Sequence, residues 1–197
     1  MDKGYARFFQ RNPMPENEAR KLFRHMRLKS FSRGEFIVKR GEFNSDFHVL
    51  DRGIWSAVQH EVDYADITLW FAFSGECVFN VWSFVMGKPS PIDIISETDS
   101  TAFVIDKDSL EEILSSEPDV AACLHKIILG HLAFYENRLL EMSRPSRATD
   151  KYKWISEWHP ELLREVPVGR IASFLGITIQ SLSRIRRHMF DDKTLKK

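Results

Sequence analysis

Residues 171–186 read IASFLGITIQSLSRIR, and this stretch decides the fold of the C-terminal part of the chain. Apolar residues at helical spacing over 171–175 predict a short helix, and Gly176 predicts a sharp turn after it. Thr178 is a favourable N-cap, so a second helix is expected over 179–189. The side chains expected to face inward from that helix are Leu182, Ile185 and Met189. Two helices joined in this way predict a helix-turn-helix.

The outer face of the second helix carries polar and cationic side chains. Glutamine and arginine form bidentate hydrogen bonds with adenine and guanine edges, and cations neutralise phosphates, so this face suits the major groove of DNA. An ordinary solvated helix face is the alternative. The residues expected to contact DNA are Thr178, Ile179, Gln180, Ser181, Ser183, Arg184 and Arg187, and Arg186 is also expected to face outward.

Charge is unevenly distributed along a chain whose formal net charge is zero. Residues 145–197 contain 11 basic and 6 acidic side chains, a formal charge of +5, which leaves −5 on residues 1–144. This asymmetry predicts separate domains with different partners. Because a proline disfavours helical geometry in its predecessor, Pro145 indicates a boundary and a hinge at 143–146.

Residues 31–105 consist of short segments rich in β-branched and aromatic residues, separated by glycines. This pattern predicts an antiparallel β-sandwich or β-barrel. The clearest strands are expected at 36–39, 47–50, 55–59, 68–71 and 101–105. Helical spacing of apolar residues over 16–26 predicts a packing helix before the strands.

Residues 118–142 are apolar over much of a helical circumference. A helix of roughly 25 residues is about 37 Å long, more than a small β domain covers, so a parallel two-helix dimer contact is favoured over a helix buried in its own core. The stripe expected to face the second copy is Leu124, Ile128, His131, Tyr135 and Met142.

Composition excludes several classes of protein. The chain has 197 residues, 43% of them hydrophobic, which is enough for packed cores. Two cysteines are too few for a disulfide framework, a four-cysteine zinc site or a four-cysteine iron–sulfur cluster, and no metal site is expected. The apolar runs are too short to span a bilayer, and residues 1–4 do not begin a secretory signal. We therefore expect a cytoplasmic protein with no membrane partner.

The segment 171–186 resembles the helix-turn-helix of the Crp/Fnr family of bacterial transcription regulators. The glycine-acid pairs of the β block, at 34–35, 41–42 and 75–76, are similar to those of the cyclic-nucleotide-binding β-roll. The resemblance implies an α+β fold with three parts: a jelly-roll-like β-roll (a double-stranded β-helix) at 1–116, a dimerisation helix at 117–144, and a winged helix-turn-helix domain at 145–197. Only residues 190–197 follow the second helix, so a complete wing is not expected.

The resemblance also implies a function. The chain would be a homodimeric, sequence-specific DNA-binding regulator, with an inverted repeat in double-stranded DNA, a second copy of itself and RNA polymerase as partners. In the family, the positions of Gln180, Ser181 and Arg184 face base edges, and Thr178 contacts phosphate. Ile179 stands where the cyclic AMP receptor type has an arginine, so the operator should differ.

The nucleotide site of the family is incomplete in this sequence. Gly75 and Glu76 match a Gly-Glu pair that contacts ribose, but Ser90 and Pro91 stand where an arginine and a serine or threonine would bind the cyclic phosphate. Without a guanidinium, burial of that phosphate would be uncompensated, so cyclic AMP is not expected as the effector. Aromatic residues near this region indicate either ordinary core or a pocket for an apolar or planar effector. The candidate pocket residues are Trp70, Phe73, Gly75, Glu76, Phe79, Trp82, Ser90 and Pro91.

Two other hypotheses remain open at this stage. The chain could be an effector-binding sensor that acts through protein contacts and has only vestigial DNA binding. It could also be an enzyme that uses Cys77 with His48 or His60, but no strand-turn-helix context or paired acid supports this, so no enzyme is expected. His48 or His60 could ligate a haem, although neither has a recognisable second ligand.

Overall fold

The computed structural model describes residues 8–9, 11–60, 66–143 and 147–194 of the chain. It begins with the short helix α2 (Glu16–Phe23) and continues into a β-roll of eight strands. The strands are β1 (Arg27–Phe31), β2 (Phe36–Val38), β3 (Phe47–Arg52), β4 (Ile54–Gln59), β5 (Ile67–Phe73), β6 (Cys77–Phe79), β7 (Asp93–Ser96) and β8 (Ser100–Ile105).

The strands form two four-stranded antiparallel sheets that face each other. One sheet has the order β1-β8-β3-β6 and the other the order β2-β7-β4-β5. Between the sheets lies an apolar core around Trp55, whose indole Nε1 donates a hydrogen bond to Ser100 Oγ over 2.8 Å. The predicted jelly-roll-like fold is confirmed.

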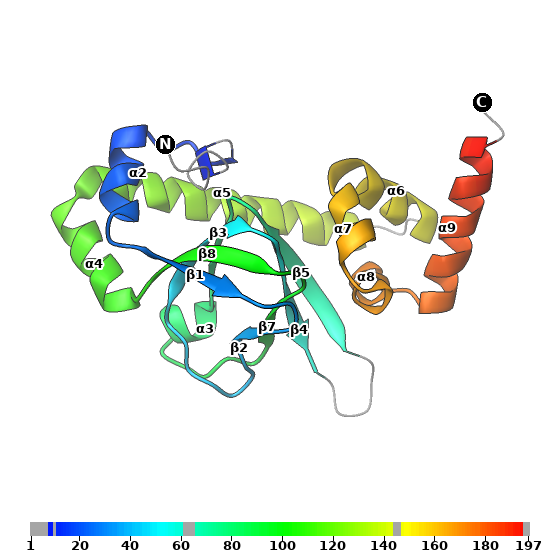
Figure 1. The fold of residues 1–197 in the computed structure, drawn as a ribbon, viewed down its shortest axis with the longest axis horizontal. Helices are drawn as coiled ribbons and strands as arrows, with labels where there is room; N and C mark the ends of the chain where they lie inside the picture. The colour runs from blue at the N-terminus through cyan, green and yellow to red at the C-terminus, as the bar shows by residue number, and fades with distance from the viewer. Residues whose placement is uncertain (1–7, 10, 61–65, 144–146, 195–197) are drawn as a thin grey trace.

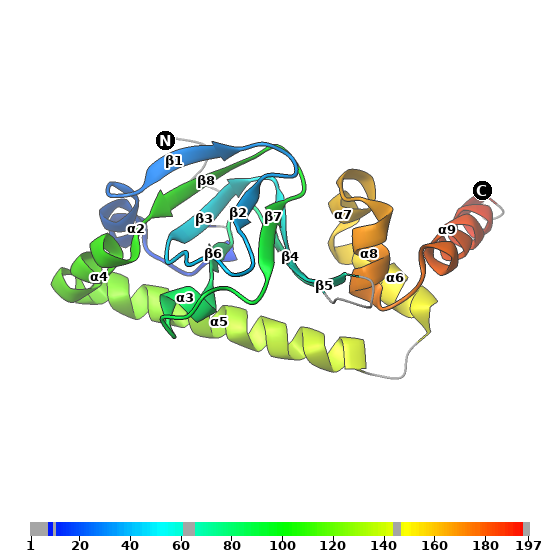
Figure 2. The ribbon, with the colours of Figure 1, turned by 90° about the horizontal axis from the view of Figure 1, so that it is seen from below.

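Helices cover one side of the roll and extend beyond it (Figures 1 and 2). The one-turn helix α3 (Val81–Phe84) follows β6, and α4 (Lys107–Ser116) follows β8. The long helix α5 (Pro118–Ser143) then runs along the roll, with α2 and α4 packed at its beginning. Beyond its end lie α6 (Ala148–Trp158), α7 (Pro160–Glu165), α8 (Val168–Leu175) and α9 (Ile179–Thr194).

The five strands expected from the sequence are all present, whereas β1, β6 and β7 were not predicted. Four of the five residues of β1 are exposed, so the strand lacks an alternating apolar pattern. The other two strands have only three and four residues. No helix in the described part of the chain is both long and apolar enough to cross a bilayer.

The C-terminal helices pack onto the outer face of the β4–β5 pair. Ile54, Phe71 and Phe73, all at most 6% exposed, share one apolar cluster with the cores of α6 to α9. The rings of Phe71 and Phe174 have their centroids 5.0 Å apart. Because burial of one such side chain contributes about 1.5–3 kcal/mol, this contact stabilises one arrangement of the two domains by several kcal/mol. The expected break at 143–146 falls largely outside the described residues.

Candidate nucleic-acid interface and effector cavity

The chain from α8 to α9 has the geometry that its sequence predicts. Gly176 ends α8 in the left-handed conformation, with φ of +66°, and the N–H of Ile177 donates to the carbonyl of Ala172 over 3.0 Å. Thr178 Oγ1 accepts a hydrogen bond from the N–H of Ser181 over 3.1 Å, which confirms Thr178 as the N-cap of α9. Leu182 and Ile185 are buried against α8 and α6, as expected.

One side of α9 is exposed and cationic. Gln180, Ser183, Arg184 and Arg187 are all exposed, and their spacing of three, four and seven residues places them on one face. Within the described part of the chain, neither arginine has a hydrogen-bond or ion-pair partner. Of the other expected contact residues, Thr178 and Ile179 are exposed beside this face and Ser181 is half-buried. The exposed side chains of this face are therefore available to a polyanion.

Two details of this region differ from the sequence prediction. Arg186 does not face solvent: its Nη2 donates to the carbonyl of Leu163 over 2.7 Å, so it attaches α9 to the end of α7. The helix also continues beyond Met189 to Thr194, and no strand follows it in the described residues.

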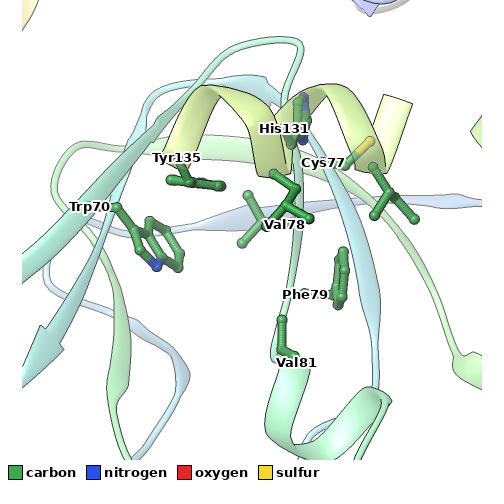
Figure 3. A pocket seen from close by; sticks show the side chains of 9 residues that line it. Trp70, Cys77, Val78, Phe79, Val81, His131 and Tyr135 are labelled. Atoms are coloured by element: carbon green, nitrogen blue, oxygen red, sulfur yellow. The ribbon is translucent and has the colours of Figure 1, made fainter. Parts of the chain in front are cut away.

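A cavity of about 180 Å³ lies between α5 on one side and β5, β6 and the start of α3 on the other (Figure 3). Figure 3 shows Tyr135 and His131 on α5 facing Trp70 and Phe79 from the roll. Burial, and secondarily the charge of Arg11, lower the pKa of His131, which favours a neutral imidazole. Among the described side chains, the lining includes no arginine or lysine and consists of Trp70, Cys77, Val78, Phe79, Val81, Ile128, His131, Leu132 and Tyr135.

Only two of the eight expected pocket residues, Trp70 and Phe79, line this cavity. Gly75 and Glu76 lie in the turn between β5 and β6, where Glu76 pairs with Arg11 over 2.6 Å and so faces the N-terminal segment. Glu76 therefore does not line this cavity, but it lines an adjoining pocket together with Arg11, His131 and Tyr135. The neighbouring Phe73 stacks on His159, with ring centroids 3.9 Å apart.

The remaining expected pocket residues lie outside the cavity lining as well. The Ser90 side chain is buried and its Oγ donates to the carbonyl of Ile92 over 2.6 Å, so the hydroxyl is used within its own turn. Pro91 is exposed, and Trp82 is 42% exposed on α3. The sequence did not indicate that α5 lines the cavity, because its apolar residues also suit a core helix or a dimer contact.

Within one protomer, the stripe expected to face a second copy lies beside the roll, and only part of it is buried there. Leu124 is 2% exposed within the core formed with α2 and α4, while Ile128, His131 and Tyr135 line the cavity. The side chain of Met142 lies outside the described residues. The sequence could not distinguish the two sides of α5, because both are apolar. The side that the structure leaves uncovered carries Leu129, Leu139 and Leu140, each at least 50% exposed, and Leu132, which is 54% exposed, lies between that side and the cavity.

The residues considered for catalysis are not assembled into a site. His48 pairs with Val78 and Val49 pairs with Cys77 across β3 and β6, so the side chains of His48 and Cys77 lie on opposite faces of the sheet. Burial raises the pKa of the Cys77 thiol and lowers the pKa of His48 to about 4, so both groups stay uncharged near neutrality. In the described residues, no group of three or more His, Cys, Asp or Glu side chains could hold a metal ion.

His60 belongs to a polar network on the outside of the roll. Its Nδ1 lies 2.6 Å from Asp66 Oδ1 and its Nε2 lies 2.6 Å from Asp93 Oδ2. These two hydrogen bonds, the one to Asp66 first, raise the pKa of His60. Both ring nitrogens are therefore engaged by carboxylates, an arrangement that orders Asp66 and leaves no nitrogen for a haem.

Comparison with known proteins agrees with this architecture. Residues 28–117 match the family model of the cyclic nucleotide-binding domain. The fold is similar to the c-di-GMP-responsive global regulator CLP from Xanthomonas campestris, with 15% identity over 91% of this chain and 93% of that chain and a TM-score of 0.70. FixK2 from Bradyrhizobium japonicum has 17% identity over 85% of this chain and 86% of that chain, with a TM-score of 0.70.

The catabolite activator protein from Thermus thermophilus has 15% identity over 92% of this chain and 86% of that chain, with a TM-score of 0.54. No curated protein matches the sequence. Residues 28–117 thus resemble a cyclic nucleotide-binding domain, and the three solved structures, each at most 17% identical, share the fold of most of the chain.

Proposed function

We propose that the chain is a homodimeric, sequence-specific DNA-binding transcription regulator of the Crp/Fnr type, with RNA polymerase as the partner expected of such a protein. The observation that carries the proposal is the exposed face of α9, on which Gln180, Ser183, Arg184 and Arg187 lie together. A helix that follows a glycine turn and presents amide and guanidinium groups fits the major groove. The formal charge of +5 on residues 145–197 supplies the electrostatic attraction to phosphates.

Two-fold symmetry of a dimer would place two such helices one DNA turn apart, so the preferred site is an inverted repeat. Sequences selected from a random DNA pool should show this symmetry, and fluorescence anisotropy then gives the affinity. Arg184→Ala should weaken binding by about 1–3 kcal/mol, or roughly 5- to 150-fold, and relax base preference.

The matched control is Arg27→Ala, which removes the same charge from an exposed position on β1 near α2, at the opposite end of the molecule from α9. If Arg184→Ala and Arg27→Ala bind the selected DNA with equal affinity and equal preference, the proposed surface is incorrect.

We further propose that the effector is an uncharged aromatic molecule and that cyclic AMP has no effect. The cavity of about 180 Å³ is only slightly larger than an engineered apolar cavity of about 150 Å³ that binds benzene, and its described lining offers no cation to a phosphate. Titration with indole should therefore give saturable heat, and Val78→Trp, which fills the cavity, should abolish it. Saturable heat on titration with cyclic AMP would contradict the proposal.

A further inference from the structure

The outer face of the β4–β5 pair is built to receive α8. Ala57 pairs with Trp70 but Val58 pairs with Thr68, so Leu69 is a bulge in β5. Because of this extra residue, Thr68 lies on the same face of the sheet as Phe71 and Phe73. All three are at most 6% exposed. Helix α8 therefore covers a continuous face of the β-roll, which is the sensor domain of the proposed regulator, rather than a single side chain.

Polar contacts surround this apolar contact and join the two domains. Arg170, in the first turn of α8, places Nη1 3.3 Å from Asp66 Oδ2 and Nε 3.4 Å from Glu97 Oε1. Ser173 Oγ donates to the carbonyl of Asp66 over 2.6 Å and accepts from the N–H of Thr68 over 2.8 Å. Both polar residues of α8 are thus occupied by the sensor domain.

The carboxylates that hold Arg170 are themselves fixed. Glu97 is 5% exposed and accepts a hydrogen bond from Ser56 Oγ over 2.5 Å. His60 contacts Asp66 from the side opposite Arg170, through the other carboxylate oxygen. Two ordered carboxylates give the guanidinium of Arg170 anionic hydrogen-bond acceptors, as DNA phosphates would.

In helix-turn-helix complexes with DNA, the first helix crosses the phosphate backbone while the second lies in the major groove. Arg170 stands at the start of that first helix. While it is bound by two carboxylates it cannot neutralise a phosphate, and the same carboxylates would repel a phosphate that approached it. DNA and the sensor domain therefore compete for this end of α8.

We infer that the docking of α8 on the β4–β5 face, fastened by Arg170 on Asp66 and Glu97, is an autoinhibitory contact that opens when DNA is bound. The inference rests on the proposed function. It adds that the acidic sensor domain acts as an internal competitor of DNA, and that an effector or a second copy activates the protein by releasing α8.

A disulfide between positions 68 and 173 tests the inference directly. The distance of 2.8 Å from Ser173 Oγ to the Thr68 nitrogen limits the separation of the two Cα atoms to at most about 6.7 Å, within the range that a disulfide spans. The variant is Thr68→Cys with Ser173→Cys in a Cys123→Ser background, because Cys77 is buried. The single Thr68→Cys variant is the control.

The oxidised double variant should bind selected DNA at least tenfold more weakly than the same protein after reduction, and the single variant should not respond to reductant. Equal affinity of the oxidised and reduced double variant would overturn the inference, provided that mass spectrometry shows the disulfide.

A charge variant tests the same contact without a crosslink. Asp66→Asn should bind selected DNA several-fold more tightly than Glu112→Gln, which removes an exposed carboxylate on α4, at the far end of the roll. Equal affinity of the two variants would contradict the inference.

If no form of the protein binds selected DNA, the proposed function fails, and hydrogen exchange decides whether the contact itself exists. The amides of α8 should then exchange faster in Asp66→Asn than in Glu112→Gln. Equal exchange in the two variants would show that the carboxylate does not hold α8.

Discussion

Leu139→Gln should dissociate the proposed dimer while leaving the protomer folded. Leu139 is 67% exposed on the uncovered side of α5, and it lies seven residues after the exposed Leu132, the repeat length of a coiled coil. Full burial of a leucine side chain contributes about 1.5–3 kcal/mol, so covering two-thirds of it contributes about 1–2 kcal/mol. A two-fold interface contains the residue twice and would lose about 2–4 kcal/mol.

That loss corresponds to a dimer dissociation constant higher by roughly 30- to 1,000-fold. Sedimentation equilibrium over a range of protein concentrations measures it, and urea unfolding of the monomeric variant shows whether the protomer is intact. Leu28→Gln is the matched control, because Leu28 is 56% exposed on β1, away from α5.

Equal dimer dissociation constants for Leu139→Gln and Leu28→Gln would show that the exposed Leu139 is not part of a dimer contact. A monomeric unsubstituted chain at the concentrations used to compare the variants would show the same. In either case the uncovered side of α5 would need a different partner.

Three further predictions concern stability. The pKa of His48 is lowered to about 4, so the unfolded state binds a proton below about pH 6.5 that the folded state takes up only near pH 4. The free energy of unfolding should therefore fall by about 3 kcal/mol as the pH decreases over that interval. His48→Gln should remove this pH dependence, as measured by urea titrations at several pH values. Arg186→Ala leaves the carbonyl of Leu163 without its partner and should cost about 1–3 kcal/mol by chemical denaturation, with Arg186→Lys less harmful. Gly53→Ala should prevent stable folding of the roll, as seen by circular dichroism, because its Cβ would lie 2.4 Å from the Cβ of Ser100 and its φ is +108°.

The structure could be predicted from the sequence where a residue determines the geometry of its own backbone. Gly176 and Thr178 set the turn and the cap between α8 and α9 by their own backbone and side-chain chemistry, so this region was predictable residue by residue. The strands that were predicted have alternating or continuous apolar residues. The edge strand β1 escaped prediction because most of its side chains face solvent.

The candidate cavity was predictable only in part, because it depends on pairing between distant segments. Gly75 and Glu76 form the Gly-Glu pair that the sequence match indicates. Asn12 Nδ2 donates a hydrogen bond to the carbonyl of Gly75 over 2.7 Å, so this pair contacts the N-terminal segment. Tyr135 and His131 enter the cavity from a helix that is apolar on both sides, and no pattern along the helix indicates which side meets the roll. Phe71 and Phe73 resembled ordinary interior residues, although they face the C-terminal domain.

The opposite charges of the two parts of the chain have a consequence for the salt dependence of DNA binding. Each phosphate that a protein cation neutralises contributes about 0.9 to the slope of the logarithm of affinity against the logarithm of salt concentration, because counterions are released. Arg170 contributes little to that slope in the unsubstituted chain, since binding exchanges its contacts with Asp66 and Glu97 for contacts with phosphate. Asp66→Asn removes one of those carboxylates, so its slope should be steeper than that of Glu112→Gln by up to about 0.9. Equal slopes would mean that Arg170 does not exchange carboxylates for phosphate, and the zero net charge would then reflect two independent domains rather than two competing partners of one cation.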